Sequence, residues 1–422
     1  MLRQLKVRRH VATTLCLLTL AAFAGVRGLH DRRAEAAPPA LIQSAAPRFE
    51  PPFENSSHRL KWANVRKDGG GYVDVQPDGS RAELTLDPAL QGRVEKLLRA
   101  HATPYAAAVV LSVEDGRVLA LAGRSTREPD KSVADLTMKP WAPAASIFKL
   151  VTATALVEHG VSPDTRVCYH DGVHSVEESN LRANPRLDRA CASLSYALAK
   201  SQNAIVARLA HDRLDEKSLS AAARALGFGA PLPFAMPVEA SAAHVPDGGL
   251  PFARTAAGFW NTTLSPLHGA YLAATLARGG VTPPLRLVDR VVDPRGNSVR
   301  PPAAPERRVV PEAAARAVGH MMVGTTEFGT ARLGFRDKRT NRPLLPGIAV
   351  AGKTGSLDRK DPYLSYSWFV GFAPADHPQV AVAVLLGNGP DWHVKAHQVA
   401  REVLGSYFEG EHETRSSRMA AR

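Results

Sequence analysis

Three short motifs, which stand in a fixed order along the chain, constrain its fold and chemistry more than any other feature. They are Ser146-Ile147-Phe148-Lys149, Ser201-Gln202-Asn203 and Lys353-Thr354-Gly355-Ser356. Two hydroxyls, two lysines and an amide are the components of a serine acyl-transferase that uses lysine in place of histidine as its base. One such motif alone arises readily by chance, but each occurs once here, in the order S-x-x-K, S-x-N, K-T-G. The set therefore predicts an acyl-transferase site.

The first motif supplies a nucleophile and its base. A serine and a lysine three positions apart face the same side of a helix, so Lys149 can reach the Ser146 hydroxyl. Lysine acts as a base only when it is neutral, and burial or a second cation lowers its pKa. We expect Lys353 to be that second cation. Taken alone, this motif also fits a serine that caps a helix and a lysine on the helix surface.

The second motif places a serine and an amide two positions apart, which suits a turn or an irregular segment. We expect Ser201 to bridge Lys149 and Lys353 and to relay a proton to the leaving amine. Asn203 is predicted to hydrogen-bond either the substrate or Lys149. A helix cap or a solvated polar pair is the alternative interpretation of these residues.

The third motif ends an apolar run that predicts an edge strand. There Lys353 and Thr354 suit a substrate carboxylate, and Gly355 lets a substrate backbone approach closely. The backbone N–H groups of Ser356 and Ser146 are predicted to form an oxyanion hole.

Residues 347–354 also match the phosphate-binding pattern G-x-x-x-x-G-K-[ST]. That pattern requires a strand before the glycine loop and a helix immediately after it. Here residues 348–351 favour a strand and residues 357–362 predict a turn, so a nucleotide site is disfavoured. The 15 histidines show no H-E-x-x-H pattern and no metal-ligand spacing, so neither a metal nor a cofactor is expected.

The formal net charge of +13 is a value that nucleic-acid-binding proteins often show. The arginines, however, are scattered and are not interleaved with aromatic residues, and no zinc-finger spacing or RNA-binding signature occurs. We therefore expect no nucleic-acid partner and interpret the charge as a generally basic surface. An anionic polymer or a membrane surface would suit it equally well.

The N-terminus has the pattern of an export signal. Lys6, Arg8 and Arg9 precede an uncharged run from Val11 to Val26. The run is short for a membrane-spanning helix and slightly long for a cleaved signal, so residues 1–27 are either an uncleaved anchor or a removed leader. In both cases the remainder of the chain is expected outside the cytoplasm.

Cysteine usage agrees with export. Cys168 and Cys191 are the two cysteines beyond the leader, and a pair in an exported domain is a candidate disulfide. Such a bridge would brace the segment that delivers Ser201. Two reduced, buried thiols are the alternative.

Residue periodicity divides the rest of the chain into a linker and short preamble (28–83), a catalytic domain (84–410) and a charged tail (411–422). Two strands precede a helical middle, and three strands and a helix close the domain. This order predicts a mixed α/β fold, a five-stranded, largely antiparallel sheet flanked by helices, with a helical subdomain. The predicted strands cover 106–113, 117–122, 347–353, 366–372 and 380–386. An amphipathic helix is predicted after a cap at 85–87, with apolar residues at helical spacing as far as Leu98. The other predicted helices cover 146–159, 194–210 with an interruption at 200–201, 265–280, 311–323 and 391–408.

The chain resembles the transpeptidase domain of penicillin-binding proteins at these motifs, from about Leu84 to Phe408. The resemblance extends to residues 85–91, to Leu264-Ser265-Pro266-Leu267 and to Trp368-Phe369-Val370-Gly371-Phe372. It implies an acyl-enzyme on Ser146, made from the D-Ala-D-Ala stem peptides of peptidoglycan and resolved by a second peptide amine or by water. The implied activity is thus that of a D,D-transpeptidase or a D,D-carboxypeptidase.

The same resemblance implies covalent capture of β-lactams and partners of cell-wall synthesis such as a glycosyltransferase. It implies a place on the extracytoplasmic face of the cytoplasmic membrane, which is the periplasm in a Gram-negative cell. Two residues depart from the family pattern: Ala145 stands where glycine is frequent, and Ser356 stands where threonine is commoner.

Two other functions stay open at this point. A serine β-lactamase shares the mechanism, but no Glu-x-x-x-Asn element lies between Asn203 and Lys353, so a deacylating water has no evident base. A β-lactam-binding sensor or a scaffold of the wall-synthesis machinery is the other alternative. The intact Ser201 and Lys353 favour catalysis over a scaffold.

Overall fold

An antiparallel five-stranded sheet is the centre of the computed structural model, which describes residues 60–391 and 394–420. Its strands, from one edge to the other, are β12 (Ala351–Lys360), β13 (Tyr363–Ala373), β14 (Val380–Asn388), β4 (Tyr105–Ser112) and β5 (Val118–Ser125). The last three strands in sequence thus lie beside the first two, and the pairing of Val384 with Ala108 joins the two groups. The predicted five-stranded sheet is confirmed.

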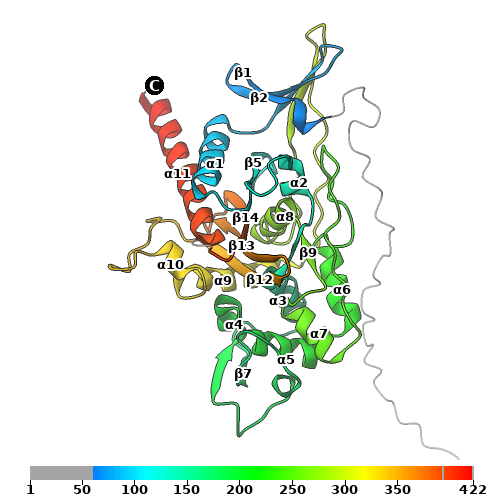
Figure 1. The fold of residues 1–422 in the computed structure, drawn as a ribbon, viewed down its shortest axis with the longest axis vertical. Helices are drawn as coiled ribbons and strands as arrows, with labels where there is room; N and C mark the ends of the chain where they lie inside the picture. The colour runs from blue at the N-terminus through cyan, green and yellow to red at the C-terminus, as the bar shows by residue number, and fades with distance from the viewer. Residues whose placement is uncertain (1–59, 392–393, 421–422) are drawn as a thin grey trace, which may run out of the picture. The chain divides into compact units, whose positions relative to one another are not determined.

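Helices cover both faces of this sheet, because alternate strand residues point to opposite sides. They are α1 (Pro88–His101) and α11 (Ala396–Ala420) on one face and α8 (Pro266–Ala277) on the other (Figure 1). Ala108 and Val110 pack into the core formed with α1 and α11. Val109 and Leu111 pack into the larger core that includes α8. Both faces of β4 are therefore buried, which explains why its sequence is an unbroken apolar run.

The helices of the middle of the chain are α2 (Val133–Met138), α3 (Lys149–Glu158), α4 (Leu194–Lys200), α5 (Asn203–Arg213), α6 (Glu216–Ala225), α7 (Gly249–Ala256), α9 (Glu312–Glu327) and α10 (Arg332–Phe335), with the 3-10 helices η2 (Ala145–Phe148) and η3 (Glu178–Leu181). Of these, α9 and η2 contact the edge strand β12, whereas α2 packs against β5 and β4 at the other edge of the sheet. Two short ladders pair β6 (Ala142–Pro143) with β9 (Thr263–Leu264) and β7 (Arg166–Tyr169) with β8 (Ala190–Ser193). The interruption predicted at 200–201 is present, because Ser201 has a φ of 56° and separates α4 from α5.

A second five-stranded sheet occupies part of the segment that was expected to be a linker and short preamble. It has the order β1 (Val65–Asp68), β2 (Gly71–Val75), β3 (Arg81–Leu84), β10 (Val288–Val292) and β11 (Ser298–Val299), and the 3-10 helix η1 (Trp62–Asn64) precedes it. The pairing of Ala82 with Val291 shows why sequence periodicity missed it. Strands of two to five residues give weak local patterns, and their partners are distant in sequence.

The ends of several elements differ from their predictions. β12 begins at Ala351, not at 347, and it continues through the residues 357–360 that predict a turn. Pairing with β13 sustains this extension, since Lys360 lies opposite Tyr363 and the reversal is confined to residues 361–362. Helix α11 continues to Ala420, through most of the predicted charged tail.

No helix within residues 60–391 and 394–420 combines the length and the apolar character needed to cross a bilayer. The predicted export signal or anchor, residues 1–27, lies outside the described residues.

Candidate active site

The first motif begins in a tight turn that leads into α3. Ala145, the residue before Ser146, has a φ of 49°, which is a left-handed conformation. The turn is packed so closely that a Cβ added at Gly258 would overlap the carbonyl oxygen of Ala145. Ser146 is partly exposed there, whereas Lys149, at the start of α3, is fully buried.

Lys149 lies at the centre of a set of short contacts. Its Nζ donates to Ser146 Oγ at 2.8 Å and to Asn203 Oδ1 at 2.6 Å. It also donates to the backbone carbonyl of Ala257, a contact that no sequence motif predicts. Burial, and secondly the charge of Lys353, lower the pKa of Lys149 well below 10.5. The sequence predicts the same lowering of the Lys149 pKa, by burial and by a second cation.

The second motif is divided by the left-handed Ser201, which ends α4, while Asn203 begins α5. Lys353 Nζ donates to Ser201 Oγ at 2.9 Å. The sequence predicts that Ser201 bridges Lys149 and Lys353, and the structure shows only one half of this bridge among the described residues. Among the described residues, the hydrogen bonds of Ser201 include Lys353 but not Lys149, which binds Asn203 instead. Because the helix is broken at Ser201, the side chains of Ser201 and Asn203 hydrogen-bond different lysines.

The third motif lies on β12, at the free edge of the sheet. Lys353 is fully buried, and burial lowers its pKa to about 7. A Cβ on Gly355 would stand 3.2 Å from Ile147 Cγ1, so the strand lies directly against the turn of the first motif. Thr354 is partly exposed and shares a hydrogen bond with the Thr330 hydroxyl, which sequence reasoning missed. Ser356 is exposed on the same edge.

A loop behind the second motif orients Asn203. The Asn203 amide donates from Nδ2 to the carbonyl of Val173 at 2.8 Å, and its backbone N–H donates to the carbonyl of Gly172 at 3.2 Å. Because its Nδ2 is bound in this way, the side-chain oxygen of Asn203 is directed at Lys149. Gly172 has a φ of 72°, and a Cβ there would overlap Ala204. Only glycine therefore fits at this point of the loop.

A buried ion pair supports this loop. Arg208 donates to Asp188 Oδ2 at 2.8 Å and to the carbonyl of Asn180 at 2.7 Å, and His170 Nδ1 lies 2.6 Å from Asp188 Oδ1. Hydrogen bonding from Arg208 strongly lowers the pKa of Asp188. Beside this group, a disulfide joins Cys168 and Cys191, which are opposite one another in the β7–β8 ladder. The next helix after β8 is α4, which ends at Ser201.

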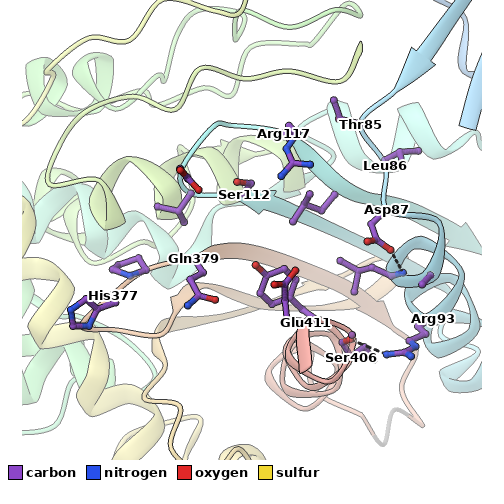
Figure 2. Close-up of a pocket in the computed structure, with 18 of the residues that line it drawn as sticks. Thr85, Leu86, Asp87, Arg93, Ser112, Arg117, His377, Gln379, Ser406 and Glu411 are labelled. Carbon is purple, nitrogen blue, oxygen red and sulfur yellow. Dashed lines mark hydrogen bonds between the residues drawn. The ribbon is translucent and has the colours of Figure 1, made fainter. Parts of the chain in front are cut away.

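A large cavity lies elsewhere, between the start of α1, the turn after β4 and the middle of α11 (Figure 2). Its volume is about 1140 Å³, and the residues of the three motifs are not among those that line it. Its charges have both signs, and prominent ones are already bound within the protein. Asp87 caps α1 through the N–H of Leu90, and Arg93 donates to the carbonyl of Ser406. This cavity is therefore separate from the candidate active site.

The described residues contain no group of three or more His, Cys, Asp or Glu side chains that could hold a metal ion. What they do contain is a partly exposed serine, two buried lysines with lowered pKa values and a free strand edge. A helix-flanked antiparallel sheet with this constellation defines a serine acyl-transferase with a lysine base.

Comparison with known proteins agrees with this class. The model of the penicillin binding protein transpeptidase domain matches residues 106–405, and the chain belongs to that family. The peptidoglycan D,D-transpeptidase PbpA of Mycobacterium tuberculosis (strain H37Rv) is 26% identical over 429 residues, which are 92% of this chain and 83% of the relative. The resemblance inferred from the sequence motifs is confirmed.

Solved structures show the same fold. The crystal structure of PBPA from Mycobacterium tuberculosis has a TM-score of 0.64 and 26% identity, and the match covers 78% of this chain and 80% of that one. The structure of the same penicillin-binding protein A as an imipenem acyl-enzyme complex has a TM-score of 0.65 and 25% identity, with the same coverage of 78% and 80%.

Proposed function

We propose that this protein is a peptidoglycan D,D-transpeptidase, or a D,D-carboxypeptidase on the same scaffold, that works through an acyl-enzyme on Ser146. One observation carries the proposal: a fully buried lysine whose pKa is lowered lies 2.8 Å from a serine hydroxyl. A neutral lysine at that distance is a general base within reach of the proton it must remove.

Acylation begins when Ser146 Oγ attacks the carbonyl carbon between the two D-alanines of a stem peptide. Lys149, in its neutral form, takes the hydroxyl proton as the Oγ–C bond forms. The negative charge on the carbonyl oxygen is stabilised by the backbone N–H groups of Ser146 and Ser356, which act as the oxyanion hole. Asn203 and the carbonyl of Ala257 hold the Lys149 ammonium once it is charged.

Release of the first product requires a proton on the departing nitrogen. When the C–N bond breaks, terminal D-alanine leaves as an amine, and Ser201 passes it a proton and is resupplied from a lysine. Lys353 is hydrogen-bonded to Ser201 at 2.9 Å and has a pKa of about 7, so it can hold or release a proton near neutral pH. Thr354 and the charge on Lys353 bind the substrate carboxylate. Gly355 lets β12 lie against the turn that carries Ser146.

The ester on Ser146 is resolved by an amine, which forms a crosslink, or by water, which trims the peptide. A β-lactam carbonyl enters the same path, and its amide nitrogen stays tethered after the ring opens. Because the sequence between Asn203 and Lys353 has no Glu-x-x-x-Asn element to activate a deacylating water, we expect the β-lactam adduct to be long-lived. This expectation separates the proposal from a serine β-lactamase.

The family and the N-terminal sequence support a proposal for the cellular setting. Relatives of this chain are named peptidoglycan D,D-transpeptidases, and peptidoglycan lies outside the cytoplasm. We propose that residues 1–27 attach this chain to the extracytoplasmic face of the membrane, beside a glycosyltransferase that supplies the glycan strands. No nucleic-acid partner is proposed.

Gel labelling of the purified full-length chain with a fluorescent penicillin, followed over hours, tests the function. We expect a persistent adduct in the wild type and in Ser298→Ala, a control at an exposed serine of β11, and no adduct in Ser146→Ala. A transient adduct with loss of the β-lactam from solution would favour a β-lactamase. Absence of any adduct would contradict the proposal.

A further inference from the structure

An exposed pair of aromatic side chains borders the site on the side of Ser201. Tyr196 of α4 is 37% exposed and Phe328, which follows α9, is 44% exposed. Their rings are stacked, with centroids 6.4 Å apart and planes inclined by 20°. Single exposed apolar residues are common on protein surfaces, but a stacked and solvated pair beside a reactive site indicates a ligand surface.

A lysine completes this surface. Lys200 Nζ lies 6.0 Å from the centroid of the Phe328 ring and donates to the Phe328 carbonyl. Its side chain is exposed, and one hydrogen bond leaves two of its three N–H donors available. Tyr196, Lys200 and Phe328 thus form a small apolar platform with one fixed cation, named here the acceptor ledge.

The acceptor ledge is joined to the reactive groups on two sides. Lys200 is followed directly by Ser201, which accepts from Lys353. Phe328 is followed by Gly329 and Thr330. The Thr330 N–H donates to the carbonyl of Ala199 at 3.1 Å, and its hydroxyl is hydrogen-bonded to Thr354. A Cβ on Gly329 would overlap that same carbonyl of Ala199, so the two backbones touch.

The direction of the chemistry assigns a role to this position. The first product leaves as an amine past Ser201, which donates its proton. By microscopic reversibility, an incoming amine reaches the acyl carbon along the same path and returns a proton to the same group. The surface next to Ser201 is therefore where the remainder of the amine-bearing molecule must lie.

We propose that the acceptor ledge binds the second stem peptide, whose amine resolves the acyl-enzyme. This inference rests on the function proposed above and goes beyond it by naming where the acceptor binds. The ligand class is a primary amine with an aliphatic side chain that ends in a carboxylate. The group next to the amine takes the place of the leaving D-alanine's carboxylate on Lys353 and Thr354. Lys200 attracts the carboxylate at the end of the chain, and the faces of Tyr196 and Phe328 pack against the chain itself.

The step is balanced by groups already present. The amine nitrogen forms a bond to the acyl carbon, and the bond from that carbon to Ser146 Oγ breaks. The amine loses one proton to Ser201, and Ser146 Oγ regains one from Lys149. A ledge that retains the amine favours this aminolysis over attack by water, so it controls the ratio of crosslinking to trimming.

The test measures how one acyl-enzyme is partitioned. The full-length chain is given an N-acyl-D-alanyl thioester as donor, with D-glutamate or D-glutamine, whose side chain is uncharged, as acceptor, and amide and acid products are counted. Both acceptors keep the carboxylate next to the amine and differ only in the charge at the end of the side chain. We expect Lys200→Gln to lower the ratio of amide to acid with D-glutamate about 2- to 5-fold, which is the effect of one exposed charge pair. The ratio with D-glutamine should not change. Lys200→Arg should restore the preference, because it keeps the cation.

A second set of variants tests the aromatic platform. Phe328→Ala should lower the ratio with both acceptors, whereas Tyr196→Phe should keep it, since the stacked ring remains. Lys217→Gln, at an exposed lysine of α6, is the control for loss of a surface charge. Counting products per acyl-enzyme removes any change in the rate of acylation from the comparison.

The outcomes distinguish a failure of the proposed function from a failure of the acceptor ledge. If the wild type forms no acyl-enzyme with the thioester or with penicillin, the proposed function fails. If acyl-enzyme forms but Lys200→Gln and Phe328→Ala divide it between amine and water as the wild type does, the acceptor ledge is wrong and the function stands.

Discussion

Lys353 donates a hydrogen bond to the Ser201 hydroxyl across 2.9 Å, although 152 residues separate them in sequence. Lys149 makes the corresponding link from the first motif to the second through Asn203. Each lysine thus pairs with one residue of the S-x-N motif, and both lysines are fully buried. Burial lowers the pKa of both lysines, and the charge of Lys353 lowers the pKa of Lys149 further, so a neutral base becomes available.

The pH dependence of acylation should report this coupling. The neutral fraction of Lys149 rises as pH rises through its pKa, so the rate of penicillin acylation should rise with pH and level off well below pH 10.5. In Lys353→Met the neighbouring cation is absent, which raises the pKa of Lys149. The midpoint of the rise should therefore move to higher pH. Stopped-flow acylation between pH 5 and 10 measures it.

The position of that midpoint, and not the height of the profile, is the readout, because Lys353→Met also removes a substrate contact. Lys217→Met should keep the wild-type midpoint. A midpoint that is unchanged or lower in Lys353→Met would show that Lys353 does not lower the pKa of Lys149.

Gly172→Ala tests the loop that orients Asn203. A Cβ at this position overlaps Ala204, so the loop must move away from the carbonyl contacts that hold the Asn203 amide. We expect a loss of stability of about 2 to 4 kcal/mol and acylation about 10-fold slower. Chemical unfolding and penicillin labelling rates check the two parts.

Gly160→Ala is the matched control for Gly172→Ala. Its φ of 81° is similar, but nothing lies within 4 Å of a Cβ there. It should lose only about 1 kcal/mol through backbone strain and should label at the wild-type rate. Equal labelling rates for the two variants would mean that the loop does not govern Asn203.

Ala145→Gly tests the strain beside the nucleophile. Ala145 holds a φ of 49°, which costs an alanine about 1 kcal/mol and costs glycine almost nothing. The variant should therefore unfold at a higher temperature and still acylate. Ala144→Gly, where φ is −62°, should instead be less stable by about 1 kcal/mol. Differential scanning calorimetry distinguishes them, and equal shifts of the same sign would refute the strain.

The Cys168–Cys191 disulfide should contribute to stability. In the chain-entropy account, a bridge over a sequence separation of 23 contributes about 3 kcal/mol. Denatured protein should accept two more alkyl groups after reduction than before it. The double variant Cys168→Ala with Cys191→Ala should match the reduced wild type and should not respond to reductant. A mass that is independent of reduction excludes the bridge.

The central sheet could be predicted because its strands are unbroken apolar runs, such as β4 and β14, whose buried faces are visible in sequence. The sheet formed by β1, β2, β3, β10 and β11 could not, because its strands are short and the pairing of Ala82 with Val291 joins distant segments. The polar half of β12 predicts a turn, because residues 357–362 are mostly charged and end in a proline. Only its pairing with β13 makes it a strand.

The candidate site also contains some residues that the sequence predicts and others that it does not. Side chains with distinctive chemistry, such as Ser146 and Lys149, form motifs and could be found. The carbonyl of Ala257 could not, because every residue has one, and only the fold places this one against Lys149. Thr330 could not be predicted either, because a single threonine forms no motif and only the fold shows its contact with Thr354.

The most direct test of the account is to locate the acyl group. The full-length chain is treated with penicillin, digested and sequenced by mass spectrometry, with Lys149→Ala run in parallel. We predict a single modified residue, Ser146, and acylation of the Lys149→Ala variant that is about 10²- to 10⁴-fold slower. An adduct on another serine, or a Lys149→Ala variant that is acylated at the wild-type rate, would contradict the lysine-activated serine.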